Sequence, residues 1–306
     1  MPKRKGKDSS GGGGKRHDSG LLAADKSLGQ NFLKNPAVVD SIVERAKLRP
    51  TDAVLEVGPG TGNLTVKLLA RAKSLVAVEF DPRMVREVKK RVEGDPRKHR
   101  LELIQGDILK TPLPFFDVCV ANLPYNISSP FLFKLLAHRP YFRCAVVMFQ
   151  EEFAQRLSAR PGDALYCRLS VNTQLLAKVT QLIKVGRNNF RPPPKVDSRV
   201  VRIELKNPPP PVNFVEWDGL VKLCFNRKNK TLRSLFTSKK VIADLETSWK
   251  TFAALRGASG ETPDVKAMVE EVVGGERFDG KRPAKMDQDD FLALLVAFNA
   301  KGLHFT

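Results

Sequence analysis

The segment Asn122-Leu123-Pro124-Tyr125 combines residue types that can activate an exocyclic amine. The amine of adenine is a poor nucleophile because its lone pair is delocalised into the ring. The Asn122 amide oxygen and the Leu123 carbonyl could accept its two hydrogens, so that the lone pair of a pyramidal nitrogen faces an electrophilic methyl group. Pro124 would fix that carbonyl, and Tyr125 offers a flat face for an extruded base. The segment indicates amine methylation on a planar base, in DNA or RNA, although Asn and Pro are also ordinary turn residues.

A glycine-rich loop, Gly58-Pro59-Gly60-Thr61-Gly62, follows an apolar run earlier in the chain. Glycines permit a tight turn and the close approach of a ligand to the backbone. Glu79 ends the next apolar run, 21 positions after Gly58, where a carboxylate can accept both hydroxyl protons of a ribose. No Walker lysine follows the loop, which excludes a P-loop. The loop and Glu79 indicate a nucleoside-bearing cofactor, and the alternative for Glu79 is a solvated strand-end carboxylate.

Four of these polar or glycine positions follow successive strand-like runs: Gly58, Glu79, Asp107 and Asn122. Ligands of open α/β sheets bind beyond the carboxyl ends of the strands. The Asp107 carboxylate could accept the hydrogen bond of an adenine N6 amine. The series favours a pocket over four unrelated loops, and it predicts S-adenosyl-L-methionine as the cofactor.

The elements that must position these residues alternate along the chain. Val85, Val88 and Val92 have helical spacing between two strand-like runs, and Pro36 suits a first helical position. Apolar strands joined through helices predict a mostly parallel sheet covered on both faces, a Rossmann-like α/β fold. Two later strands without a clear helix between them predict a closing antiparallel pair. The seven predicted strands are 53–57, 75–80, 101–105, 117–121, 145–149, 177–185 and 198–205.

The composition changes twice along the chain. Residues 1–25 are basic and glycine-rich, which predicts a disordered tail. The run Pro208–Pro211 is stiff and cannot continue a sheet, so 207–212 reads as a linker. Residues 26–206 therefore form the predicted methyltransferase domain, and 213–306 form a small helical domain.

The formal net charge of +19 predicts a polyanionic partner, with nucleic acid favoured over an anionic membrane. No uncharged apolar run approaches the roughly 18 to 20 residues that a membrane-spanning helix needs. The 4 cysteines and 4 histidines are scattered without metal-ligand spacing, so neither a metal site nor a disulfide framework is expected. A secretory signal is not expected either, because no apolar stretch follows the basic start.

Three segments carry a resemblance to a known family, the small-subunit ribosomal RNA adenine dimethyltransferases. It covers about residues 27–306. The segments are Ser27-Leu28-Gly29-Gln30-Asn31-Phe32-Leu33, Asn122-Leu123-Pro124-Tyr125 and Phe190-Arg191-Pro192-Pro193-Pro194-Lys195-Val196-Asp197-Ser198. The resemblance implies that Asn31 and Leu33 line the cofactor pocket with Gly58, Gly60, Glu79, Asp107 and Asn122. It also implies that Phe190 sandwiches the base against Tyr125, where the alternative is a core aromatic at a proline-rich turn.

The segment 225–233 resembles the part of the family's helical domain that faces ribosomal RNA. Its cations suit phosphate contact, although a solvated face is the alternative. The chain end at 298–305 resembles the eukaryotic nucleolar branch, whereas that branch often has His where Asn31 stands. The predicted RNA-binding residues are Arg227, Lys228, Lys230 and Arg233.

The resemblance implies dimethylation of the N6 amines of two adjacent adenosines near the 3′ end of small-subunit rRNA. The expected partners are this rRNA and the pre-ribosomal small subunit, with the enzyme acting as a monomer. Alternatives are an assembly factor that acts mainly by binding pre-rRNA, and a mitochondrial transcription-factor-like relative. The basic cluster at 3–7 predicts a nuclear localisation signal, with a nonspecific RNA-contacting arm as the alternative. The resemblance to the nucleolar branch implies the nucleolus rather than the mitochondrion or cytoplasm.

Overall fold

The computed structural model describes residues 24–25, 28–255 and 263–305. Most of the predicted tail at 1–25 lies outside these residues. The central element is a seven-stranded sheet in the order β4-β3-β2-β5-β6-β9-β7. Its strands are β2 (Ala53–Val57), β3 (Ser74–Glu79), β4 (Leu101–Gln105), β5 (Val118–Asn122), β6 (Cys144–Gln150), β7 (Ala177–Val185) and β9 (Ser198–Leu205).

The first five strands of this order are parallel, and β9 is antiparallel to both β6 and β7. The predicted mostly parallel, seven-stranded sheet with a closing antiparallel pair is therefore confirmed. Parallel pairing brings the carboxyl ends of β2 to β6 to one edge of the sheet. The residues that follow those strands are thus neighbours in space.

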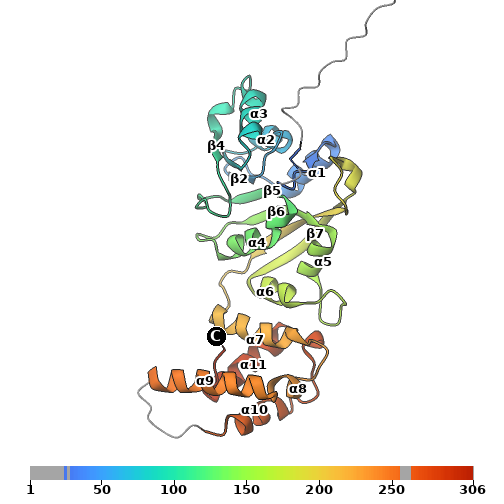
Figure 1. Ribbon diagram of the computed structural model, residues 1–306. Coiled ribbons are helices and arrows are strands. Elements are labelled where there is room, and N and C mark those ends of the chain that lie inside the picture. Colours follow the sequence, from blue (N-terminus) through green and yellow to red (C-terminus); the bar gives the residue numbers. More distant parts are fainter. Residues whose placement is uncertain (1–23, 26–27, 256–262, 306) are drawn as a thin grey trace, which may run out of the picture.

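Helices cover both faces of the sheet because its central strands are apolar on both sides (Figure 1). In β2 the Val54 side chain packs on one face, and those of Leu55 and Val57 pack on the other. One face is covered by α1 (Pro36–Ala46) and α2 (Asn63–Leu69), and the other by α4 (Ser128–Ala137) and α5 (Glu151–Ser158). The remaining helices of this region are α3 (Pro82–Val92) and α6 (Arg168–Leu176).

Local signals explain where two of these helices begin. The side chains of Asn35 and Asp81 accept hydrogen bonds from the first turns of α1 and α3, and a proline follows each cap. A short antiparallel ribbon, β1 (Phe32–Leu33) with β8 (Phe190–Arg191), was not predicted. It joins two segments that are far apart in the sequence.

The chain after β9 is helical and lies at one end of an elongated molecule (Figure 1). The proline run falls between β9 and the first of these helices. None of the described helices is long and apolar enough to cross a membrane. The helices are α7 (Phe214–Asn226), α8 (Leu232–Phe236), α9 (Lys239–Leu255), α10 (Val265–Gly274) and α11 (Gln288–Ala300).

The helical region shares its apolar core with α6 and the loop before it. Val171 of α6 packs in the same cluster as Trp217, and the Trp217 indole donates to Asn172 Oδ1 at 3.0 Å. The Tyr166 hydroxyl donates to the Met286 carbonyl at 2.8 Å. The proline run therefore separates two stretches of sequence, while α6 packs with both.

Candidate active site

A cavity of about 290 Å³ lies at the carboxyl edge of the parallel strands. It brings together predicted residues from five separate segments. No lysine, arginine or histidine is among the described residues that line it. The predicted residues at its wall are Asn31, Leu33, Gly58, Gly60, Glu79, Asp107, Asn122, Leu123, Pro124 and Tyr125.

Glu79 is held in place by the backbone around it. Its two carboxylate oxygens accept hydrogen bonds from the backbone N–H groups of Gly60 and Asp81, each at 2.9 Å. The side chain is only 7% exposed, and burial raises its pKa. A carboxylate has about four lone-pair sites, so the two oxygens can still accept hydroxyl hydrogens from a ligand.

Two glycines of the loop permit contacts that a side chain would block. Gly58 has φ 68°, and a Cβ there would lie 3.3 Å from the Asn122 carbonyl oxygen. Gly60 has φ 54°, and a Cβ there would lie 3.0 Å from the Phe32 ring. Both positions need glycine for their backbone angle and for space. The glycine-rich loop consequently touches the Asn122–Tyr125 segment on one side and the Phe32 side chain on the other.

Asp107 begins a loop whose backbone carbonyls accept hydrogen bonds from a lysine of α4. One Asp107 oxygen accepts from the Leu109 N–H at 2.9 Å, and the other has no partner among the described residues. The Lys134 ammonium of α4 donates to the carbonyls of Ile108, Leu109 and Thr111 at 2.8, 2.9 and 2.6 Å. Lys134 thus orders the loop so that one Asp107 oxygen stays available to a ligand.

The segment Asn122–Tyr125 presents two hydrogen-bond acceptors that no described residue uses. Neither the Asn122 side chain nor the Leu123 carbonyl forms a hydrogen bond with any described residue. The Tyr125 hydroxyl lies 2.6 Å from the hydroxyl of Ser198, which is fully buried at the start of β9. Burial raises the pKa of Tyr125. A neutral, anchored phenol ring suits a stacking role.

Comparison with known proteins identifies the family. A family model described as ribosomal RNA adenine dimethylase matches residues 22–257 of the chain. The chain belongs to this family.

Relatives of this dimethylase family member are similar over nearly their whole length. A probable dimethyladenosine transferase of Dictyostelium discoideum is 58% identical over 92% of this chain and 90% of its own. An Arabidopsis thaliana protein named ribosomal RNA small subunit methyltransferase is 50% identical over 95% of this chain and 94% of its own. The crystal structure of a dimethyladenosine transferase from Plasmodium falciparum is 46% identical, with a TM-score of 0.84, over 90% of this chain and 100% of that one.

Several residues of this family member's cavity were missed by the sequence analysis. Phe80 directly follows Glu79, lines the cavity and is 57% exposed, so its ring can face a flat ligand. Gln30 donates to the Asp81 carboxylate at 2.9 Å and ties the segment before β1 to the cavity. Arg83 also donates to that carboxylate, and it holds the pKa of Asp81 at about 2. The sequence did contain a signal for Phe80, because a large apolar side chain directly follows the carboxylate that ends β3.

The structure places Phe190 outside the cavity, so its predicted role against the base stays a prediction. Its side chain is 1% exposed and packs in the core between the sheet and α1. It pairs in register with Leu33 across the β1–β8 ribbon and does not line the cavity. A ring enclosed in this way presents no face to the cavity in this structure. Phe190 pairs with Leu33, and Leu33 lines the cavity, so Phe190 supports the cavity wall without reaching the cavity itself.

The four cations predicted to contact RNA have different environments. Arg227, Lys230 and Arg233 are exposed. The Lys228 ammonium instead donates to the carbonyls of Ala164 and Tyr166 at 2.9 and 2.7 Å. It joins the helical region to the loop before α6, which corrects its assignment as a phosphate contact. Charge alone could not distinguish it from its neighbours.

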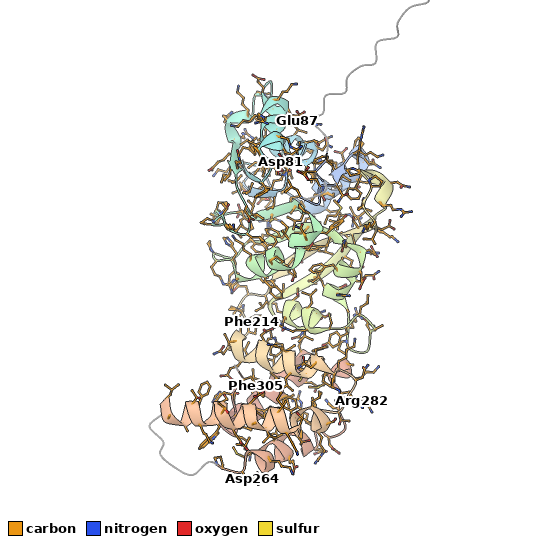
Figure 2. The ribbon with its side chains drawn as sticks, viewed as in Figure 1. Asp81, Glu87, Phe214, Asp264, Arg282 and Phe305 are labelled. Atoms are coloured by element: carbon orange, nitrogen blue, oxygen red, sulfur yellow. The ribbon has the colours of Figure 1, made fainter. Side chains whose placement is uncertain are left out.

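This cationic loop is far from the cavity. The Arg282 side chain donates to the Asn229 carbonyl, so the position of Arg282 shows where the loop at 227–233 lies. Figure 2 shows Arg282 and Phe305 in the helical region, toward the opposite end of the molecule from Asp81. No group of three or more candidate metal ligands occurs in the described part of the chain.

Proposed function

We propose that this protein transfers methyl groups from S-adenosyl-L-methionine to the N6 amines of two adjacent adenosines near the 3′ end of small-subunit rRNA. The observation that carries the proposal is the pair of unused acceptors, Asn122 and the Leu123 carbonyl, in one cavity with Glu79 and Asp107. The names of the relatives from Dictyostelium and Arabidopsis support the adenosine and the small subunit.

The lining of the cavity fits the methyl donor. Glu79 has acceptor sites left for the two ribose hydroxyls, and the unused Asp107 oxygen can accept from the adenine N6 amine. The exposed ring of Phe80 can cover the adenine face. S-adenosyl-L-methionine supplies an electrophilic methyl group on a sulfonium.

The residues of this chain act mainly by positioning the target amine. Asn122 Oδ1 and the Leu123 carbonyl each accept one amine hydrogen, which directs the nitrogen lone pair toward the methyl group. Pro124 has no N–H and so offers no competing donor beside that carbonyl. The nitrogen becomes acidic as it is alkylated, so no strong base is needed. After the first methyl only one N–H remains, and one of the two acceptor contacts is then given up.

The decisive experiment measures methyl incorporation into purified small subunits by the Asn122→Ala and Asn122→Asp variants. Removal of a transition-state hydrogen bond typically slows a reaction by about 10²- to 10³-fold, and we expect that loss for Asn122→Ala. Asn122→Asp keeps an oxygen acceptor and should retain more activity. Both should bind S-adenosyl-L-methionine. Unimpaired methylation by Asn122→Ala would refute the role assigned to this residue.

We also propose that the protein binds the pre-ribosomal small subunit as a monomer in the nucleolus. The exposed cations Arg227, Lys230 and Arg233 support a binding role that is independent of the cavity. The predicted localisation signal at 3–7 lies outside the described residues. Imaging of a tagged protein tests the location. A variant that cannot bind cofactor yet restores pre-rRNA processing would assign the processing role to binding alone.

A further inference from the structure

The amino edge of the sheet, opposite the cavity, is rich in cations. The segments that lead into β2, β3, β4 and β6 each carry exposed lysine or arginine side chains. We call this surface the amino-edge patch. Its members are Lys47, Arg49, Arg71, Lys73, Lys98, Arg100 and Arg139, all exposed.

Hydrogen bonds between these segments show that the patch is continuous. The Lys73 N–H donates to the Asp52 carbonyl at 2.9 Å, which joins the segments before β3 and β2. The Arg100 guanidinium donates to the Ala72 carbonyl at 3.4 Å, which joins the segments before β4 and β3. Arg143, just before β6, pairs with the Asp52 carboxylate and thereby adds the fourth segment. The four loops therefore form one surface.

The charges of the amino-edge patch are not neutralised from within. None of its seven members forms an ion pair with a described residue, whereas the nearby Arg97 and Arg143 pair with Asp95 and Asp52. Asp52 itself is 3% exposed. Unpaired like charges on adjacent loops repel one another, which an external anion would relieve.

Two further features accompany these cations. Phe115, in the segment that leads into β5, is 60% exposed. Because β5 lies between β2 and β6, the segment that carries Phe115 leads into a strand between two strands whose lead-in segments belong to the patch. At the β4 end, Lys98 lines a hollow of about 510 Å³ together with Lys89, Lys90 and the carboxylate-bearing Glu93. An exposed aromatic among arginines and lysines suits contact with nucleic acid.

We propose that the amino-edge patch binds the phosphate backbone of an RNA segment distinct from the one that enters the cavity. Strands rise about 3.3 Å per residue, so the two edges of a five-residue strand such as β2 are separated by about 17 Å. Neighbouring strands are about 4.8 Å apart, so the patch extends roughly 20 Å from β4 to β6. One nucleotide cannot occupy both edges.

RNA is favoured over an anionic membrane by the composition of the surface. Phe115 is the one large hydrophobic side chain on these lead-in segments that is exposed within the described residues. A membrane-binding surface would need a broad apolar face beside its cations. The choice of RNA rests on the proposed function, which already requires rRNA.

The test compares two variants that lose the same charge. One carries Arg49→Gln, Arg71→Gln, Lys73→Gln and Lys98→Gln. The control carries Lys222→Gln, Lys240→Gln, Lys250→Gln and Lys266→Gln, all exposed on the helical region. Affinity for a small-subunit rRNA transcript is measured at several salt concentrations. Each lost phosphate contact lowers the slope of log affinity against log salt by about 0.7 to 0.9. For the four substitutions of the patch variant we expect a decrease of roughly 3, with at least about a tenfold loss of affinity.

Cofactor binding and methylation of a short adenosine hairpin serve as folding controls, and the patch variant should retain both. A wild-type salt slope in the patch variant, or an equal loss in the control variant, would overturn the proposal. So would loss of binding to phosphatidylserine vesicles with rRNA binding unchanged, since the surface would then serve a membrane. If the unaltered protein failed to methylate, the proposed function would fail while the binding result still decided the patch.

Discussion

The sheet region and the helical region hold their functional side chains in different ways. At the cavity, side chains are fixed by backbone groups: Glu79 accepts from two N–H groups, and Lys134 donates to three carbonyls. In the helical region, exposed cations such as Arg227 and Arg233 stand on a surface whose shape comes from an apolar core. A reaction needs atoms at set positions, whereas the phosphate contact proposed for the helical region needs exposed charge on a stable surface.

The two regions also differ in how they bury a carboxylate. Glu216 of α7 bonds to His304 Nδ1 at 3.0 Å. Glu56 is the second-last residue of β2, just before the glycine-rich loop. Neither of its carboxylate oxygens has a hydrogen-bond partner among the described residues. Burial raises the pKa of Glu56 to about 8, and the Thr65 hydroxyl beside it offsets this only in part. The sheet region thus leaves both oxygens of a buried carboxylate without a partner near its cavity. The helical region pairs one oxygen of Glu216 with His304 and leaves the other without a partner among the described residues.

The largest expected effect breaks the core that the two regions share. Trp217→Ala removes a fully buried ring and leaves Asn172 without its donor, so we expect a loss of about 3–5 kcal/mol in the free energy of unfolding. Urea unfolding followed by circular dichroism should show one transition at lower urea. Val296→Ala, at a position 67% exposed, should change stability by less than about 0.5 kcal/mol. Two separate transitions would show that the regions unfold independently.

The second prediction concerns the unfavourable carboxylate. The folded state holds the Glu56 proton up to about pH 8, and the unfolded state releases it near pH 4.5. Stability should therefore fall as pH rises through this window and level off above it. Glu56→Gln removes that loss, and we expect it to be more stable than the unaltered protein by roughly 4 kcal/mol at pH 8. Thermal unfolding across the pH range measures this, with Glu102→Gln on exposed β4 as control. If the stability of Glu56→Gln changed with pH in parallel with that of the unaltered protein, the prediction would be wrong.

A third prediction sharpens the role of fixed polar groups. Glu79→Gln replaces one carboxylate oxygen by an amide donor that cannot accept from a backbone N–H or a ribose hydroxyl. We expect cofactor affinity to fall by about 10- to 100-fold, as for a lost hydrogen bond to a charged group. Isothermal titration with S-adenosyl-L-methionine measures this. Unchanged affinity would place the ribose elsewhere.

The smallest effects separate Lys228 from its neighbours. Arg227→Gln, Lys230→Gln and Arg233→Gln should each flatten the salt dependence of rRNA binding by about 0.7 to 0.9 in slope. Lys228→Met should leave that slope unchanged, but lower the free energy of unfolding by about 1–3 kcal/mol because two carbonyls lose a charged donor. Salt titrations and urea unfolding distinguish the two. Equal slopes in all four variants would restore Lys228 to the phosphate-binding group.

The sequence predicts the sheet well because each strand carries its own signal. The strands predicted at 101–105, 177–185 and 198–205 have these bounds in the structure. The cavity follows from the order of Gly58, Glu79, Asp107 and Asn122, since parallel strands must align their carboxyl ends.

Contacts between distant segments escape this reasoning. The β1–β8 ribbon has two residues in each strand, which is too short for a periodic pattern. An aromatic beside prolines, as at Phe190, has the same local sequence whether it is buried or exposed. The bonds from Lys228 to Ala164 and Tyr166 span more than sixty positions, so neither segment announces the other.

The core that α6 shares with the helical region fixes the distance between the helical region and the cavity. Because α6 runs directly into β7, the cationic loop at 227–233 and the Asn122–Tyr125 segment belong to one packed body. The spacing between the cations proposed to bind RNA and the segment proposed to hold the amine is then a fixed property of the protein. Under the proposed function, an adenosine would be selected by its distance from the RNA segment that these cations bind. Only an adenosine at the matching distance would reach the cavity. Neighbouring bases of the same chemistry would be passed over because they do not reach.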